Sequence, residues 1–159
     1  MNHAIGDLAK KYHKAKTLFF VGRNTDYAIA LEGALKMKEI SYIHAEAYAA
    51  GELKHGTIAL IEDHQPVFAL CCNASLQEKM ISNILEVKTR GAEVLAVTYK
   101  DNKEIVSVAD DIVYVPCAET IFSAITEVIP LQLLAYYVAK EKGCDIDKPK
   151  NLAKSVTVE

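Results

Sequence analysis

Apolar runs alternate with segments of helical periodicity along most of the chain. Four short, nearly continuous apolar runs predict buried strands at residues 17–22, 66–72, 93–98 and 111–116. Between and after them, apolar residues recur every three to four positions, which predicts helices at residues 26–43, 75–90 and 120–142. Gly91 and Gly143 directly follow two of these helices, as is typical of helix ends.

Strands that are apolar throughout are typical of a parallel sheet covered on both faces. With right-handed crossovers, the alternation predicts an α/β fold, a three-layer αβα sandwich around a doubly wound, flavodoxin-like parallel sheet. We expect this domain to span residues 17–144. Residues 1–16 are predicted to form an amino-terminal helix or interdomain remnant, and residues 145–159 a separate carboxy-terminal tail. The polar side of the first helix carries Lys10, Lys11, Lys14 and Lys16.

Composition narrows the class of protein. Of the 159 residues, 51% are hydrophobic, which is enough for the core of one domain. The net charge of −3 offers no basic surface for nucleic acid and no long-range attraction for an anionic ligand. The chain starts without a signal-peptide hydrophobic region, and its most apolar helix is too short and interrupted to span a membrane. We therefore expect a cytoplasmic protein without nucleic-acid or membrane partners.

Cysteine and histidine spacing argues against a metal centre. The four cysteines, Cys71, Cys72, Cys117 and Cys144, lack the paired spacing of zinc sites, and no histidine cluster accompanies them. We expect reduced cysteines that pack as small hydrophobic residues, and no metal.

A charged stripe is predicted on the first long helix. Glu32, Lys36 and Glu39 fall at i, i+4 and i+7, which places them on one helix face. In most helices such a stripe is simply solvated, and each pair contributes about 0.2–0.5 kcal/mol. The spacing alone does not show whether the stripe has a function beyond this. The faces that pack are expected to use Leu31, Leu35, Met37 and Ile40.

The last fifteen residues also allow two interpretations. They are polar and carry Pro149, Asn151 and Ser155, which favour turns and extended backbone. A frayed terminus is the usual fate of such a segment. However, its composition is varied, with Leu152 and Ala153 directly before Lys154, which is typical of a segment that binds in a specific groove.

Four motifs resemble one known family. They are residues 31–41 (Leu-Glu-Gly-Ala-Leu-Lys-Met-Lys-Glu-Ile-Ser), 44–56, 130–136 and 151–159 (Asn-Leu-Ala-Lys-Ser-Val-Thr-Val-Glu). From about Leu18 to the last residue, the chain closely resembles the carboxy-terminal sugar isomerase (SIS) domain of the glutamine–fructose-6-phosphate aminotransferases, also called glucosamine-6-phosphate synthases. Members of that family also have a glutaminase domain and a first SIS domain, which this sequence does not include. We therefore expect the chain to be inactive alone.

The resemblance implies roles for individual residues. Lys154 is expected to form an imine with the C2 ketone of fructose 6-phosphate, and Ala153 to contact the substrate through its backbone. Glu39 is the carboxylate that contacts the substrate and moves a proton from C1 to C2, assisted by Lys36. His55 is expected to catalyse ring opening in the active site of a partner subunit, so that residues 46–56 cross over in a homodimer. The product is glucosamine 6-phosphate, and no cofactor is needed.

The sequence contains no strong phosphate-binding loop. In an open parallel sheet, ligands bind beyond the carboxyl ends of the strands, and we expect Glu39 near that edge. The helix after the first strand begins with Asp26, whose own charge can cap the helix amino terminus in place of a phosphate. The loop at residues 72–78 offers only Ser75, where phosphate-binding SIS domains usually have several Ser and Thr residues. We therefore expect the chain not to hold a sugar phosphate unaided.

Two other functions remain open from the sequence. SIS domains also occur in regulators, so the chain could be a sugar-phosphate-sensing module, although a sensor has no use for an imine-forming lysine. The weak phosphate loop also allows a purely architectural dimerisation domain.

Overall fold

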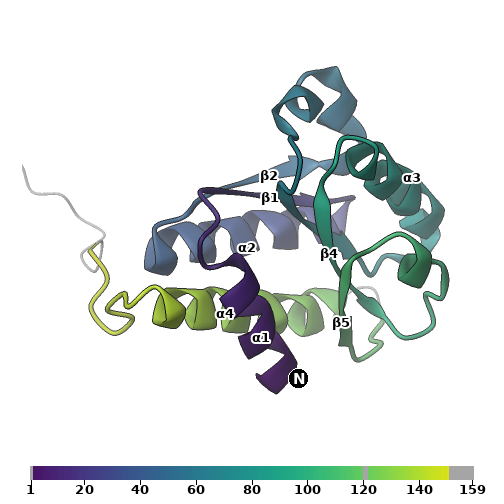
Figure 1. The fold of residues 1–159 in the computed structure, drawn as a ribbon. Coiled ribbons are helices and arrows are strands. Elements are labelled where there is room, and N and C mark those ends of the chain that lie inside the picture. The colour runs from purple at the N-terminus through teal and green to yellow at the C-terminus, as the bar shows by residue number, and fades with distance from the viewer. Residues whose placement is uncertain (1, 120–121, 151–159) are drawn as a thin grey trace, which may run out of the picture.

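The computed structural model describes residues 2–119 and 122–150. One sheet of five parallel strands runs through the centre in the order β2-β1-β3-β4-β5 (Figure 1). The strands are β1 (Thr17–Gly22), β2 (His44–Ala49), β3 (Pro66–Cys71), β4 (Glu93–Tyr99) and β5 (Asp111–Val115). The helices are α1 (Asn2–Tyr12), α2 (Thr25–Ser41), α3 (Gln77–Lys88) and α4 (Ser123–Glu141). Short 3₁₀ segments are η1 (Ala50–His55), η2 (Thr57–Leu60), η3 (Ala74–Leu76) and η4 (Glu104–Ser107).

Every predicted strand and helix is present, and the prediction of an α/β fold with a parallel sheet is confirmed. The prediction missed one strand, β2. Its sequence alternates between alanine and polar residues, His-Ala-Glu-Ala-Tyr-Ala, so it has the period of a strand but few of the branched residues that favour one. It forms an edge of the sheet, where only one strand neighbour is needed.

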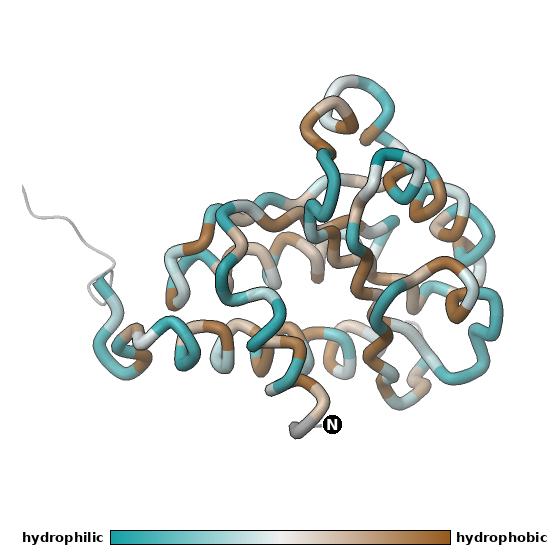
Figure 2. Tube along the Cα trace, in the orientation of Figure 1, coloured by the Kyte–Doolittle hydropathy of each residue, from teal (hydrophilic) through white to brown (hydrophobic). Residues whose placement is uncertain are grey.

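Alternating strand residues divide the core into two layers. In β1, Leu18 and Phe20 face a core covered by α1, α2 and α4, whereas Phe19 and Val21 face a second core covered by α3 and the 3₁₀ segments. Hydrophobic positions therefore follow the central strands and the inner sides of the helices (Figure 2). These layers confirm the predicted three-layer sandwich.

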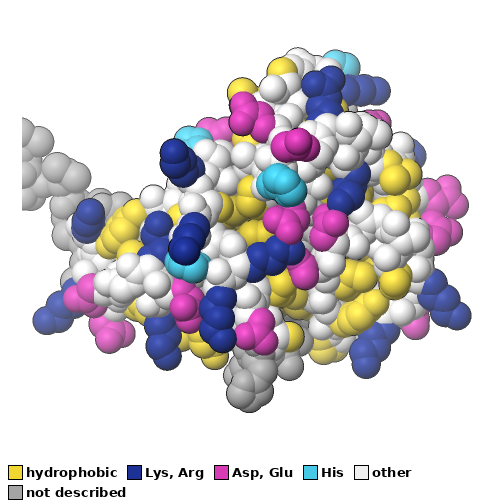
Figure 3. All heavy atoms as spheres, viewed as in Figure 1, with side chains coloured by type: hydrophobic (Ala, Val, Ile, Leu, Met, Phe, Trp, Pro, Cys, Tyr) yellow, Lys and Arg dark blue, Asp and Glu magenta, His cyan; other side chains and the backbone are white. Residues whose placement is uncertain are grey.

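Helix α1 packs as part of the first core. Ile5, Ala9 and Tyr12 are buried, while Lys10 and Lys11 are exposed on the helix, and Lys14 and Lys16 are exposed just after its end. The Lys11 ammonium lies 2.6 Å from Asp111 and 2.5 Å from Glu93, so it binds the helix to the ends of β5 and β4. On the face shown in Figure 3, basic and acidic side chains are interspersed.

Helix α2 crosses α4 at a glycine. A Cβ atom on Gly33 would lie 2.7 Å from Leu131 and 3.0 Å from Phe20, so only glycine fits between the two helices and the sheet. Met37 is buried nearby, as predicted. The prediction that Leu31 and Leu35 pack was wrong, because they are 47% and 42% exposed on the outer side of α2.

The four cysteines are free thiols, in agreement with the sequence. Burial raises the pKa of Cys71 to about 12, so this thiol is a packed, unreactive group. In the part of the chain that the structure describes, no helix has the length and apolar character needed to cross a membrane.

Candidate active site

The charged stripe of α2 forms one connected group. The Lys36 Nζ atom lies 2.5 Å from Glu39 Oε2 and 3.7 Å from Glu32 Oε1, so the predicted face is correct. The hydrogen bond to Glu39 raises the pKa of Lys36. Partial burial lowers this pKa, but the negative charges of Glu39 and Glu32 raise it further, so that the net shift is upward. Lys36 therefore stays protonated near neutral pH and acts as a fixed positive charge rather than as a base.

The stripe lies at the amino edge of the sheet, not at the carboxyl edge as the sequence suggested. Glu39 is in the last turn of α2, and α2 runs back along the sheet from the carboxyl end of β1. The next strand then starts with His44 paired to Thr17, the first residue of β1. Ligands of open parallel sheets usually bind beyond the carboxyl ends of the strands, and Glu39 lies at the opposite edge.

The carboxy-terminal segment comes to this same end of α2. Tyr42, which ends the helix in a left-handed conformation, accepts a hydrogen bond of 2.9 Å at its hydroxyl from the Lys150 backbone. The Lys150 ammonium lies 4.8 Å from the centre of the Tyr42 ring, a cation–π contact. Lys150, within the tail, is thus held at Tyr42, three residues beyond Glu39. Ala153 and Lys154, the other predicted site residues, lie outside the described residues.

The structure does not bring His55 to Glu39 within one chain. His55 ends η1 and is exposed on the segment 50–60, which projects from the body at the top of Figure 1. This segment follows the carboxyl end of β2, whereas Glu39 lies near its start. The six residues of β2 alone rise about 20 Å. If both residues serve one site, they must come from different subunits.

Asp26 occupies the helix terminus that could have bound phosphate. The structure corrects its expected role, because Asp26 does not cap α2 but crosses to the loop after β3. Its Oδ2 accepts hydrogen bonds from the backbone N–H groups of Cys72 (2.9 Å) and Asn73 (3.1 Å). Burial raises the pKa of Asp26, while these hydrogen bonds oppose the shift. The carboxyl group thus takes two of the amides that a phosphate would need.

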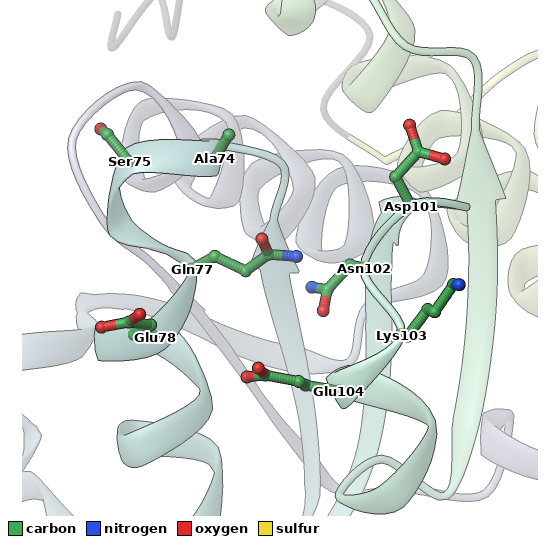
Figure 4. Close-up of a pocket in the computed structure, with 8 residues that line it drawn as sticks. All are labelled: Ala74, Ser75, Gln77, Glu78, Asp101, Asn102, Lys103 and Glu104. Atoms are coloured by element: carbon green, nitrogen blue, oxygen red, sulfur yellow. The ribbon is translucent and has the colours of Figure 1, made fainter.

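The carboxyl edge carries an acidic cavity. It has a volume of about 390 Å³ and is lined by Ala74, Ser75, Gln77, Glu78, Asp101, Asn102, Lys103 and Glu104. The amides of Gln77 and Asn102 point toward one another across it (Figure 4). The lining includes three carboxyl groups and one lysine, and the Ser75 hydroxyl donates to Asn73 rather than to the cavity. This crevice therefore disfavours an anionic sugar phosphate.

Sequence reasoning missed a second polar group, on β2. His44, Glu46 and Tyr48 lie on one face of the strand, with His44 Nε2 3.3 Å from Glu46 Oε1 and the Tyr48 hydroxyl donating to Glu46 Oε2. The hydrogen bond to Glu46 raises the pKa of Tyr48 to about 12, while the Thr57 side chain lowers it. The signal that could have identified this group is the period-two alternation of residues 44–49.

Comparison with known proteins identifies similar sequences and structures. Residues 11–141 match the SIS domain family. The chain is 56% identical to glutamine–fructose-6-phosphate aminotransferase (isomerizing) from Clostridium tetani, over 96% of its own length and 25% of that protein. The same enzyme from Thermus thermophilus is 52% identical, over 98% of this chain and 26% of the relative. The chain thus spans about a quarter of the length of these relatives.

A solved structure is similar over most of the chain. It is the C-terminal domain of glucosamine-fructose-6-phosphate aminotransferase from Francisella tularensis, with a TM-score of 0.88 and 40% identity. The match covers 92% of this chain and 42% of that one.

Proposed function

Because the chain belongs to the SIS domain family, we propose that it is the second isomerase domain of a glutamine–fructose-6-phosphate aminotransferase, which makes glucosamine 6-phosphate. The observation that carries the proposal is the contact of Lys150 with Tyr42, which holds the tail at the end of the helix that bears the charged stripe. This contact brings the segment that precedes Lys154 to the helix that carries Glu39.

Simple geometry supports a common site for Lys154 and Glu39. Glu39 precedes Tyr42 by three residues, about 4.5 Å along the helix axis. Lys154 follows Lys150 by four residues, which can span up to about 14 Å. Starting from the Lys150–Tyr42 contact, the Lys154 amine can therefore reach the Glu39 carboxylate without any rearrangement of the described fold.

The proposed reaction divides the chemistry between these residues. The neutral Lys154 amine attacks the C2 ketone of the open sugar, and loss of water gives an imine. Ammonia then replaces the lysine nitrogen at C2. Glu39 takes a proton from C1 and returns it to C2, while Lys36 remains a fixed positive charge beside it. Only a neutral amine can attack the ketone, and a lysine amine has an ordinary pKa of about 10.4. The proposed reaction therefore requires burial or positive neighbours that favour the neutral form of Lys154.

We further propose a homodimer in which His55 serves the site of the partner subunit. The support is its exposure on the projecting segment and its separation from Glu39. A chain that sensed sugar phosphate would need a crevice that accepts an anion. The cavity at the carboxyl edge is acidic, which disfavours such a ligand and supports the shared site instead. The phosphate would then be held by a first SIS domain. A cytoplasmic location stays a prediction from the sequence.

A chimera tests the proposal. This chain would replace the matching quarter of the Clostridium tetani enzyme. We expect the chimera to make glucosamine 6-phosphate and, without ammonia, to be trapped covalently by borohydride and fructose 6-phosphate. Lys154→Ala should abolish trapping, whereas Lys148→Ala, on the same segment, should retain it. Trapping and turnover in the Lys154→Ala chimera would contradict the proposal and favour the regulatory alternative.

A further inference from the structure

The exposed apolar side chains are concentrated on one layer of the sandwich. Of the ten large hydrophobic side chains that are exposed in the described part of the chain, seven lie on α2, on α4 or directly at the ends of these helices. The other three, Leu60, Leu85 and Val106, lie on three separate elements. Single exposed side chains are normal, whereas a concentration of them on one face marks an interaction surface.

The exposed apolar residues of α2 and α4 form one face. Helix α4 packs beside α2 on the same side of the sheet (Figure 1). On each helix, the exposed apolar residues share one side, opposite the buried residues that face the sheet. Their side chains are 42–60% exposed. We call this set the α2–α4 face, and it consists of Leu31, Leu35, Ile125, Ile129 and Tyr136.

The charged stripe of α2 borders this face. Leu35 comes three residues after Glu32 and four before Glu39, so the three side chains are neighbours on the helix surface. A partner that covers the α2–α4 face would therefore also cover the Glu39 carboxylate and exclude water from it. In such a closed site, charges interact more strongly than they do in water.

The length of the substrate in the proposed reaction restricts where its phosphate can bind. C1 and the phosphorus atom of open-chain fructose 6-phosphate are seven bonds apart, which is roughly 9 Å at full extension. Because Glu39 acts at C1, the phosphate must bind within about this distance of its carboxylate. The acidic cavity is at the other edge of the sheet, and a strand of six residues rises about 20 Å. A separate phosphate-holding domain would therefore have to contact the surface around Glu39.

We propose that the α2–α4 face is the docking surface for a second domain of the proposed enzyme, the domain that holds the substrate phosphate. Glu39 then acts at the junction of the two domains. The identity of the partner rests on the proposed function, whereas the apolar face does not. The solved structure from Francisella tularensis contains enough further chain for such a domain, because more than half of it lies outside the match to this chain. The contact of Lys150 with Tyr42, at the end of α2, brings the tail to the same junction.

Hydroxyl-radical labelling of side chains tests the docking surface directly. In the chain by itself, Leu31, Ile125 and Tyr136 should be oxidised, because they are exposed. In the chimera, where the other domains of the Clostridium tetani enzyme are present, these three residues should lose most of their labelling. Leu85 of α3, which is as exposed as Leu31 at 47%, is the matched control and should be oxidised in both proteins.

Two results of the labelling would overturn the proposal. Full labelling of the α2–α4 face in an active chimera would show that no domain covers it, while the proposed function would stand. If the face is protected in the chain by itself and this protection decreases on dilution, a second copy of the chain covers it instead. Protection in a chimera that borohydride does not trap would support the docking surface and contradict the proposed function.

A charge placed on the face tests its importance for turnover. Ile125→Glu in the chimera should lower kcat/KM for fructose 6-phosphate at least about tenfold, because docking would bury an unpaired charge. Val106→Glu, in η4 and equally exposed at 60%, is the matched control and should change kcat/KM little. Neither substitution should alter urea unfolding of the chain by itself, where both side chains are in solvent. Unchanged kcat/KM in both Ile125→Glu and Leu31→Glu would overturn the proposal, while loss of trapping in Lys154→Ala would still support the proposed function.

Discussion

The ammonium of Lys36 lies 2.5 Å from a carboxylate oxygen of Glu39, one turn further along α2. Glu39 is partly exposed, so the pair is accessible to a substrate as well as to solvent. An exposed pair of this kind contributes at most about 1 kcal/mol to stability. The pair therefore contributes little to folding, and its catalytic role stays a proposal.

Replacing the carboxylate should separate two steps of the proposed reaction. Glu39→Gln in the chimera is expected to lower kcat by about 10²–10⁴-fold, because the amide cannot carry the proton. Borohydride trapping should persist, since imine formation precedes proton transfer. Glu32→Gln, on the same face but 3.7 Å from Lys36, is the matched control and should change kcat by less than about fivefold. Near-normal turnover in Glu39→Gln would remove Glu39 from the mechanism.

Mixed dimers should reveal whether His55 acts across subunits. Lys154→Ala and His55→Asn chimeras are each expected to be inactive. In a statistical mixture, half of the dimers are hybrids, and each hybrid has one site with both residues intact if His55 comes from the partner. Mixing should therefore restore about a quarter of the original activity. No recovery despite demonstrated subunit exchange would mean that each subunit uses its own His55.

Glu127 should make the stability of the fold depend on pH. This residue of α4 is fully buried, and a side-chain hydrogen bond with Ser123 opposes the effect of burial on its pKa. Burial, together with the nearby Asp26, raises its pKa to about 7. The folded state thus holds a proton that the unfolded chain releases near pH 4.5, so the free energy of unfolding should fall as pH rises from about 4.5 to about 7. The expected loss is about 3 kcal/mol.

Urea unfolding at pH 4.5 and pH 8 measures this dependence. Glu127→Gln should be more stable than the original chain at pH 8, with little difference at pH 4.5, because the amide carries no charge at either pH. Glu141→Gln, exposed near the end of the same helix, should leave the pH dependence unchanged. An equal effect of Glu127→Gln at both pH values would show that Glu127 does not titrate in this range.

Gly33 should be intolerant of even a methyl group. Gly33→Ala is expected to destabilise the fold by about 1–3 kcal/mol, because the added Cβ would overlap Leu131 and Phe20 where α2 crosses α4. Gly6→Ala, in α1 with no atom within 4 Å of the new Cβ, should instead be neutral or stabilising by about 0.5–1 kcal/mol. Chemical denaturation of both variants provides the comparison. If Gly33→Ala is as stable as Gly6→Ala, the two helices are free to move apart.

The strands and helices that have a strong periodicity were predictable from the sequence. Apolar runs identified β1, β3, β4 and β5, and the spacing of Glu32, Lys36 and Glu39 placed them correctly on one face of α2. Strand β2 was missed because its small alanines provide little hydrophobic signal. The roles of Ala153 and Lys154 come from the resemblance alone and stay predictions.

Only the tertiary structure decided which groups the residues of these local patterns contact. Asp26 reads as a helix cap in the sequence, yet it binds the loop after β3, which is 46 residues away from it at Cys72. Leu31 and Leu35 have the period of a packed face but remain exposed, because Gly33 and Met37 lie on the side that meets α4 and the sheet. Likewise, Glu39 is at the amino edge because α2 runs antiparallel to the strand before it. Periodicity is a property of one segment, whereas a site depends on which segments pack together.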